Sequence, residues 1–207
     1  MNRHLLAISL VSALLIPGQS LAAANTDPDW PCVQRKVPEL SVAQVWTAGE
    51  LAPGAGDWKK DDALARLVAT ISARKTPLED AQKQIEDYAA GLAPAQAKEK
   101  LEQMFQGVFD TLNGERKQVI AGIARYAGKQ RDMAADVRKS ASEVDRLRRQ
   151  PDVDQAELAK RSDQLAWETR IFQERVHSLT FVCEVPTIIE QRLYSLSKII
   201  AQAMTKS

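Results

Sequence analysis

Few side chains in this sequence could do chemistry together, and two cysteines form the clearest pair. Cys32 and Cys183 are the two cysteines among 207 residues, and they lie near opposite ends of the chain. In an oxidising compartment, a lone pair of cysteines most simply forms one disulfide. The alternative is a redox-active or metal-binding thiol pair, but no C-x-x-C spacing supports it. The sequence therefore predicts a Cys32–Cys183 disulfide.

Catalysis by histidine would depend on His177, because the other of the two histidines lies in a segment that we expect to be removed. His177 sits within a helical pattern, with Glu174 and Phe181 at i−3 and i+4. No nucleophile elbow, P-loop, EF-hand loop or G-x-G-x-x-G motif occurs. The methionines are scattered, and the paired carboxylates are typical of solvated helix faces. We therefore expect no catalytic residue, metal or cofactor; an enzyme that uses carboxylates is the least favoured alternative.

Three of the four tryptophans, Trp30, Trp46 and Trp58, lie in the N-terminal part of the chain. One interpretation is that they pack as large anchors on a helical body that has few aromatic side chains of its own. A segment with little regular structure needs such burial to be ordered. The alternative is a ligand site. A groove lined by Trp46, Trp58 and Trp167 would suit a ligand-binding or chaperone-like module.

A group of arginines, Arg146, Arg148 and Arg149, precedes a predicted turn at 150–152. Acidic residues are interleaved with these arginines, which is typical of a solvated tip with ion pairs between neighbouring turns of helix. The functional interpretation is a docking surface for a protein partner or for anionic envelope lipid. The sequence leaves both interpretations open.

The charge balance excludes one class of partner. Lysine plus arginine total 28 and aspartate plus glutamate total 27, so the formal net charge is +1. A general nucleic-acid binder needs an excess of positive charge to neutralise phosphates, so we expect no nucleic-acid partner. The hydrophobic share of 44% and the charged share of 27% are those of a globular protein.

The first 24 residues have the pattern of a secretory signal peptide. Arg3 supplies the positive charge, residues 5–16 are mostly apolar, and small residues follow at 22–24. The alternative, an uncleaved membrane anchor, would need about 20 apolar residues. Cleavage removes one arginine and no acid, which brings the formal net charge to zero. We expect an exported protein, periplasmic or secreted, and no later stretch that spans a membrane.

The remainder divides into an N-terminal segment, 25–56, that contains tryptophan, proline and one short helix, and a helical domain, 57–207. The periodicity from residue 57 onward is that of helices, and no alternating pattern predicts a strand. Ser41 and Gln44 form a capping-box pattern for the short helix, and Pro77 and Pro94 stand at helix starts. The expected elements before Pro94 are a loop over 49–56 and helices over about 58–74 and 77–88.

A long helix from Pro94 to about Arg149 keeps a seven-residue apolar spacing for about six heptads, as in a coiled coil. Asn113-Gly114 is a weak point at which the helix either breaks or continues. Asp152 is expected to cap a return helix, in which Pro186 causes a kink or an interruption. The seam of the return helix is expected to contain Leu158, Leu165, Phe172, Val176, Leu179 and Cys183.

These patterns predict an all-α fold, a long antiparallel helical hairpin with shorter N-terminal helices packed on it and one disulfide. The expected function is a non-enzymatic interaction or structural role in the bacterial periplasm or cell envelope, through a helix face or the hairpin tip. A protein partner is expected. A homo-oligomer is open, because a seam can be filled within one chain or between chains.

Overall fold

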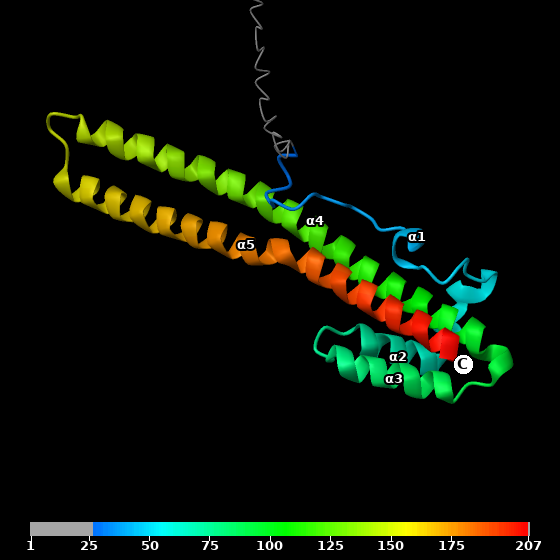
Figure 1. The fold of residues 1–207 in the computed structure, drawn as a ribbon. Coiled ribbons are helices and arrows are strands. Elements are labelled where there is room, and N and C mark those ends of the chain that lie inside the picture. The colour runs from blue at the N-terminus through cyan, green and yellow to red at the C-terminus, as the bar shows by residue number, and fades with distance from the viewer. Residues whose placement is uncertain (1–26, 207) are drawn as a thin grey trace, which may run out of the picture.

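The computed structural model describes residues 27–206, and the predicted signal segment, 1–24, lies outside this range. The structure is 79% helical, and its described residues contain no strand, which confirms the all-α prediction. The long helices α4 and α5 form an antiparallel hairpin (Figure 1). The elements are α1 (Val42–Val45), η1 (Pro53–Lys60), α2 (Asp62–Ser72), α3 (Leu78–Ala90), α4 (Pro94–Arg148) and α5 (Gln155–Lys206).

Helix α4 is unbroken over its 55 residues, including Asn113 and Gly114. Asn113 is buried, and its side chain bonds the backbone of Leu40: Nδ2 donates to the carbonyl at 3.2 Å and Oδ1 accepts from the N–H at 3.4 Å. These long-range bonds occupy a side chain that could otherwise compete for its own helix backbone. At about 1.5 Å per residue, α4 is roughly 80 Å long.

Helix α5 runs for 52 residues through Pro186, so of the two outcomes expected at this proline, a kink or an interruption, the interruption does not occur. Proline lacks the N–H that would bond to the carbonyl of Val182, and its ring crowds that turn. The turns on both sides are held by other contacts, because Cys183 is in a disulfide and Ile189 is fully buried. Tertiary packing thus outweighs the local helix-breaking preference of proline.

The turn of the hairpin lies between Arg148 and Gln155, in agreement with the predicted position. Asp154 caps α5, since its Oδ1 accepts from the N–H of Ala156 at 2.9 Å. The prediction that Asp152 is the cap is therefore wrong. Towards the tip only two helices pack together, and Leu158, Leu165, Phe172 and Leu179 are half-buried rather than buried.

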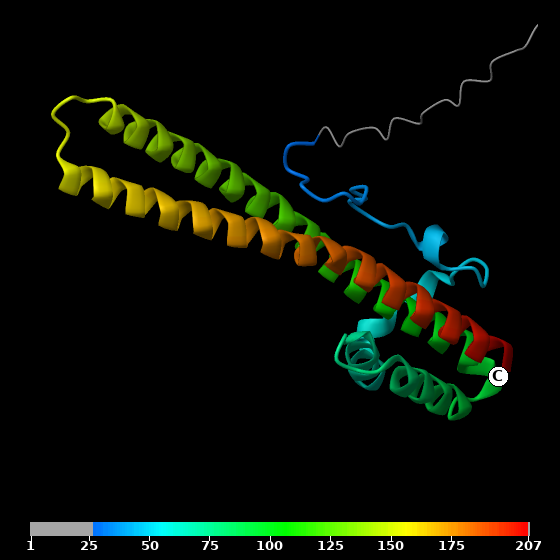
Figure 2. The ribbon, with the colours of Figure 1, turned by 60° about the vertical axis from the view of Figure 1, so that its left-hand side comes forward.

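Val176 was expected on the seam, but its side chain is 46% exposed. In this part of the molecule α5 is paired with α4 and with no other helix, as Figure 2 shows. The prediction that Val176 is a seam residue is therefore wrong. The other expected end of that seam, Cys183, is buried.

Asp61 separates η1 from α2, so the helix predicted over about 58–74 begins later than expected. The Oδ1 atom of Asp61 accepts from the backbone N–H groups of Ala63 and Leu64, both at 3.1 Å, as an N-cap. Lys100 of α4 donates to the other carboxylate oxygen at 2.8 Å and lowers the pKa of Asp61. Trp58 consequently lies in the 3-10 segment η1, part of which falls in the predicted loop 49–56.

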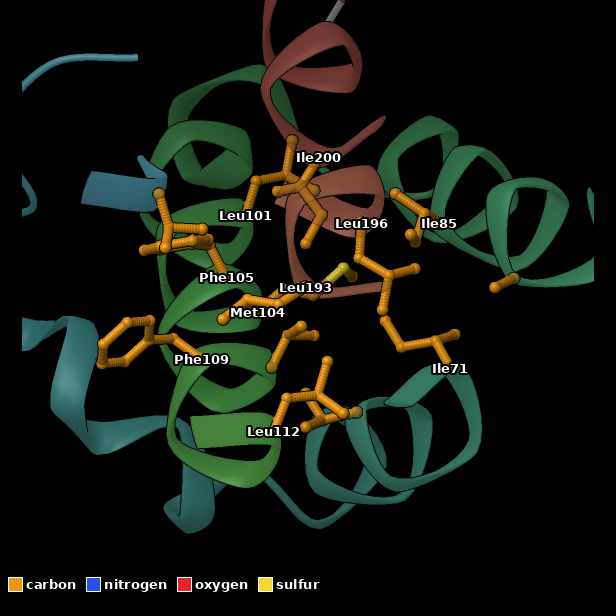
Figure 3. Close-up of a cluster of buried hydrophobic side chains, with 14 of the residues drawn as sticks. Ile71, Ile85, Leu101, Met104, Phe105, Phe109, Leu112, Leu193, Leu196 and Ile200 are labelled. Carbon is orange, nitrogen blue, oxygen red and sulfur yellow. The ribbon is translucent and has the colours of Figure 1, made fainter. Parts of the chain in front are cut away.

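The main core lies in the half of the hairpin away from the tip. Helices α2 and α3 cover one side of the α4–α5 pair, and α1 with the preceding segment lies along the other (Figures 1 and 2). Leu196 of α5 faces Ile71 of α2 and Ile85 of α3, and all three side chains are fully buried (Figure 3). The shorter N-terminal helices therefore pack on the hairpin as predicted.

Candidate functional site

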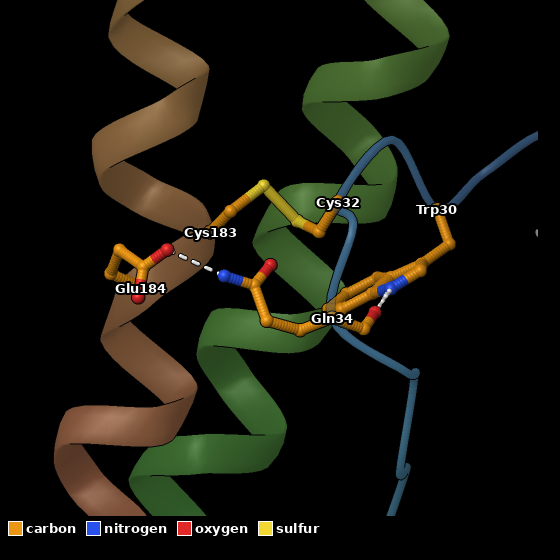
Figure 4. The surroundings of a disulfide bond; sticks show 5 residues. All are labelled: Trp30, Cys32, Gln34, Cys183 and Glu184. Carbon is orange, nitrogen blue, oxygen red and sulfur yellow. Dashed lines mark hydrogen bonds between the residues drawn. A yellow bond between two sulfur atoms is a disulfide. The ribbon is translucent and has the colours of Figure 1, made fainter. Parts of the chain in front are cut away.

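The predicted disulfide is present and fastens the N-terminal segment to the hairpin. Cys32 and Cys183 are bonded, with their Cα atoms 5.5 Å apart (Figure 4). We call residues 27–40 the strap. Gln34 donates from Nε2 to Glu184 Oε1 at 2.5 Å, and Trp30 donates from Nε1 to the carbonyl of Gln34 at 2.6 Å. The disulfide and these bonds give the strap a defined position across α4 and α5.

The strap also has a small apolar core and charged fastenings of its own. Trp30 and Cys32 are buried with Cys183 and with Ile120 and Ile123 of α4. Further along, Lys36 bonds Asp27 at 2.7 Å, and Arg131 of α4 bonds Asp29 at 2.6 Å. The strap is therefore ordered by burial as well as by the covalent bond.

The three N-terminal tryptophans are packing anchors. Trp30, Trp46 and Trp58 are 4%, 5% and 8% exposed. The Trp46 ring stacks on Phe105 with the ring centroids 4.2 Å apart, and Trp58 donates from Nε1 to Asp110 Oδ2 at 3.0 Å. These contacts agree with the interpretation that the tryptophans hold the N-terminal segment on the helical body.

The structure does not bring Trp46, Trp58 and Trp167 together. Trp167 is 65% exposed on the part of α5 that pairs with Ser140, through the bond from Ser140 Oγ to Glu168 Oε2. Ser140 and Phe105, the ring on which Trp46 stacks, are separated along α4 by roughly 50 Å at the rise of an α-helix. A groove lined by all three tryptophans is therefore not formed.

The arginines at the tip lie among acids. Arg148 approaches Asp145 at 3.6 Å, and Arg161 bonds Glu157 at 2.8 Å, which raises the pKa of Arg161. Arg146 and Arg149 are exposed, and neither forms an ion pair within residues 27–206. The tip thus presents both signs of charge, as a solvated helix end does.

The groups considered for catalysis are dispersed. His177 is exposed, and its ring meets Phe181 edge-on with centroids 5.4 Å apart, while Glu174 pairs with Arg170 at 3.0 Å. Within the described part of the chain, no group of three or more histidine, cysteine or acidic residues could hold a metal ion. No helix there is long and apolar enough to cross a membrane.

Exposed apolar side chains are concentrated on α5. Of the eight large apolar residues that are exposed in the described chain, six lie on this helix. Trp167, Phe181 and Ile188 among them are 65%, 66% and 48% exposed, and they are spaced by multiples of seven residues. Contiguous exposed apolar patches mark interaction sites, whereas apolar residues scattered singly over a surface are normal.

We call the line of positions 167, 171, 174, 178, 181, 185 and 188 the outer seam of α5. These positions alternate in steps of four and three residues, which is the spacing of a helix that contacts another helix. Five of the seven residues are apolar, and the other two are Glu174 and Ser178. The seam predicted from the sequence, Leu158 to Cys183, is the one that faces α4, and we call it the inner seam. The outer seam was not predicted, although the same spacing rule could have revealed it.

The outer seam begins where α2 and α3 end. Arg192 of α5 donates from Nη2 to the carbonyl of Ile71 at 2.6 Å and from Nε to the carbonyl of Ser72 at 3.1 Å. These are the last two residues of α2, so Arg192 satisfies carbonyls that the helix leaves without internal partners. Burial lowers the pKa of Arg192. Towards the tip, α5 has neither α2 nor α3 beside it (Figure 2).

A groove lies beside the disulfide, on another flank of α5. It has a volume of about 450 Å³ and lies between α4, α5 and the strap. Val176, Leu179 and Cys183 of α5 line it together with Gln130 of α4 and Val33 of the strap. Val176 and Phe181 are five residues apart, which turns their side chains about 140° away from each other on an α-helix. The groove and the outer seam are therefore separate surfaces.

Comparison with known proteins adds no relative: no protein family, curated protein or solved structure matches this chain.

Proposed function

We propose that this chain is a non-enzymatic, exported protein of the bacterial periplasm or cell envelope that binds a helix of a protein partner along the outer seam of α5. The observation that carries the proposal is a row of apolar side chains at helix-contact spacing, of which Trp167, Phe181 and Ile188 are exposed and Ile171 and Val185 are half-buried. Its length of 22 positions corresponds to roughly 33 Å, or about six turns of a partner helix.

A helix is the favoured partner because helices already occupy the same side of α5 further down. Leu196 of α5 is buried against α2 and α3, and Arg192 marks the point where this cover ends. The outer seam continues that interface towards the tip. A partner helix would lie on it as α2 and α3 lie on the lower part, with apolar side chains interdigitating between the turns.

The middle of the outer seam sets a chemical requirement on the partner. Glu174 and Ser178 replace apolar residues there, and a polar pair within an apolar seam fixes the register of the opposing helix. The Glu174 carboxylate accepts from Arg170 on one side and keeps further acceptor capacity. The partner helix should therefore be amphipathic, with a basic or hydrogen-bonding side chain at the middle of its apolar face.

Export is supported by the disulfide. Disulfides persist in oxidising compartments and are rare in the cytosol, and the Cys32–Cys183 bond is the staple that holds the strap. The signal-like pattern at 1–24 supports the same compartment, and the periplasm is the one we propose.

Photo-crosslinking in intact cells tests the proposal. A benzoylphenylalanine at position 181 lies on the outer seam. The same group at position 173, which is exposed on α5 but belongs neither to the seam nor to the groove beside the disulfide, is a matched control. We expect one crosslinked envelope protein from position 181, attached through an amphipathic helix, and none from position 173. Adding Ile188→Asp should reduce the crosslink from position 181 at least fivefold.

Two outcomes would overturn this function. One is the absence of any crosslink from position 181 in cells that export the protein. The other is a crosslinked product whose mass and peptides identify a second copy of this chain, because the seam would then be a dimer interface.

A further inference from the structure

Gln130 of α4, one of the residues that line the groove beside the disulfide, has a buried amide group without a partner. Gln130 of α4 is 9% exposed, and neither its Nε2 nor its Oε1 atom forms a hydrogen bond. Gln34, on the opposite wall, uses Nε2 to bond Glu184 but leaves its buried Oε1 atom without a donor. Folded proteins pair nearly all buried side-chain amides, so these three atoms are places where an added hydrogen-bonding group would be favourable.

The other residues that line the groove are mainly apolar, and the charged ones among them already have partners. Phe172, Val176 and Leu179 of α5 line it, opposite Ala127 and Ala134 of α4. The charged residues at its edges are already paired: Arg131 bonds both Asp29 and the carbonyl of Pro28, and Glu184 accepts from Gln34. An ion would gain no free counter-charge here, so an uncharged ligand is favoured.

We propose that this groove binds an uncharged, apolar segment of extended polypeptide. One of its side chains enters between Phe172, Val176 and Leu179, and the backbone of an adjoining residue pairs with the amide of Gln130, whose side chain turns into the groove to meet it. A residue in extended conformation presents its own N–H and C=O on the same side of the strand, and these match the Oε1 and Nε2 atoms of Gln130. This site is independent of the outer seam and of its partner helix.

Two other ligand classes match less well. An acyl chain would fill the apolar walls but leave the amide of Gln130 unpaired. A packed helix is about 10 Å across and has no free N–H groups along its face, so it can neither enter a groove of about 450 Å³ nor pair with Gln130. That volume lies within the range of small-ligand pockets, about 300–1,000 Å³.

The test measures binding of a blocked peptide to the oxidised protein by titration calorimetry. The probe is acetyl-Gly-Val-Phe-Val-Gly-amide, and its control is the same peptide with N-methylated backbone amides, which lack the N–H donors. Decanoate serves as the acyl-chain probe. We expect the parent peptide to bind at least tenfold more tightly than either of the other two.

Three variants separate binding from folding. Gln130→Met keeps the unbranched shape but removes the amide, so we expect at least tenfold weaker peptide binding and a melting temperature no lower than that of the wild type. Gln103→Met is the matched control, because Gln103 is also buried on α4 but donates to the carbonyl of Gly54 at 3.3 Å. It should lower the melting temperature without changing peptide affinity. Val176→Asp, at a half-exposed wall position, should weaken binding without disturbing the core.

The proposal is overturned if the parent peptide does not bind at millimolar concentration, or if decanoate binds as tightly as the peptide. It is equally overturned if folded Gln130→Met and Val176→Asp proteins bind the peptide like the wild type. Phe181→Asp, on the outer seam, should leave peptide affinity unchanged, which keeps this test separate from that of the partner helix.

Discussion

At Gly107, side chains of η1 and α2 pack directly against the backbone of α4. A Cβ atom added there would lie 2.9 Å from Cδ2 of Trp58 and 2.9 Å from Cγ2 of Val68, closer than such carbons approach in real structures. The absence of a side chain at Gly107 is thus what lets η1 and α2 pack against α4. Glycine is otherwise unfavourable in the middle of a helix, so packing rather than local preference explains it here.

Replacing Gly107 with alanine should destabilise the protein by about 1–3 kcal/mol, because the indole of Trp58 and the side chain of Val68 must both move. Gly114→Ala is the matched control on the same helix, since no atom lies within 4 Å of its added Cβ. That substitution should stabilise the protein by about 0.5–1 kcal/mol through helix preference. Urea unfolding followed by circular dichroism measures both changes, and effects of the same sign at the two glycines would contradict the packing explanation.

At the scale of helices, most starts and ends could be predicted from local signals. Pro94 begins α4, and α3 ends at Ala90, next to Gly91, as expected from the sequence. Local signals left the outcome open, or predicted a break that does not occur, where distant residues decide. Asn113 is held by Leu40, and Pro186 is flanked by a disulfide and a buried isoleucine, so α4 and α5 continue where the sequence signals a weak point or a break.

The candidate sites were less predictable than the helices. The outer seam was not predicted because α5 has two rows of apolar residues at helix-contact spacing. The inner row, Leu158 to Leu179, is the more regular of the two and was the one recognised. The groove depends on where the strap crosses the hairpin, which the chain determines only after folding. That the amide of Gln130 is left without a partner is a property of its neighbours and has no signature in the sequence.

One side chain of α5, Arg192, hydrogen-bonds the C-terminal end of α2. Replacing it with methionine should cost about 2–3 kcal/mol, because the two carbonyls at the end of α2 lose charge-assisted hydrogen bonds while the aliphatic stem is kept. Hydrogen exchange should accelerate in α2 and α3 but not towards the hairpin tip. Lys198→Met, an exposed position on the same helix, should change stability by less than about 0.5 kcal/mol. Equal loss of protection at the tip would show that Arg192 does not act locally.

Across the whole molecule, packing is uneven along the hairpin. The half near the C-terminus is covered by α2 and α3 on one side and by α1 and η1 on the other, whereas the half near the tip consists of two helices alone (Figure 1). Both proposed binding surfaces lie between these halves or on the uncovered one. Lower local stability is expected there, and binding of a partner would add the cover that the fold does not supply.

The disulfide lies at the edge of the covered half of the hairpin. It joins positions 151 residues apart and holds the strap in place there. The loop-entropy model assigns such a link about 5 kcal/mol, so Cys32→Ala/Cys183→Ala should lose roughly 3–5 kcal/mol of unfolding free energy. The far-ultraviolet circular dichroism should remain that of a helical protein, because the core around Leu196 contains no cysteine. Trp30 should become solvent-exposed, which a red shift in its fluorescence would report.

Because the strap forms one wall of the groove but not of the outer seam, the Cys32→Ala/Cys183→Ala variant should lose affinity for the blocked peptide and keep the crosslink from position 181. Loss of both activities together would mean that the strap supports the hairpin itself, and retention of both would mean that the disulfide does not position the groove.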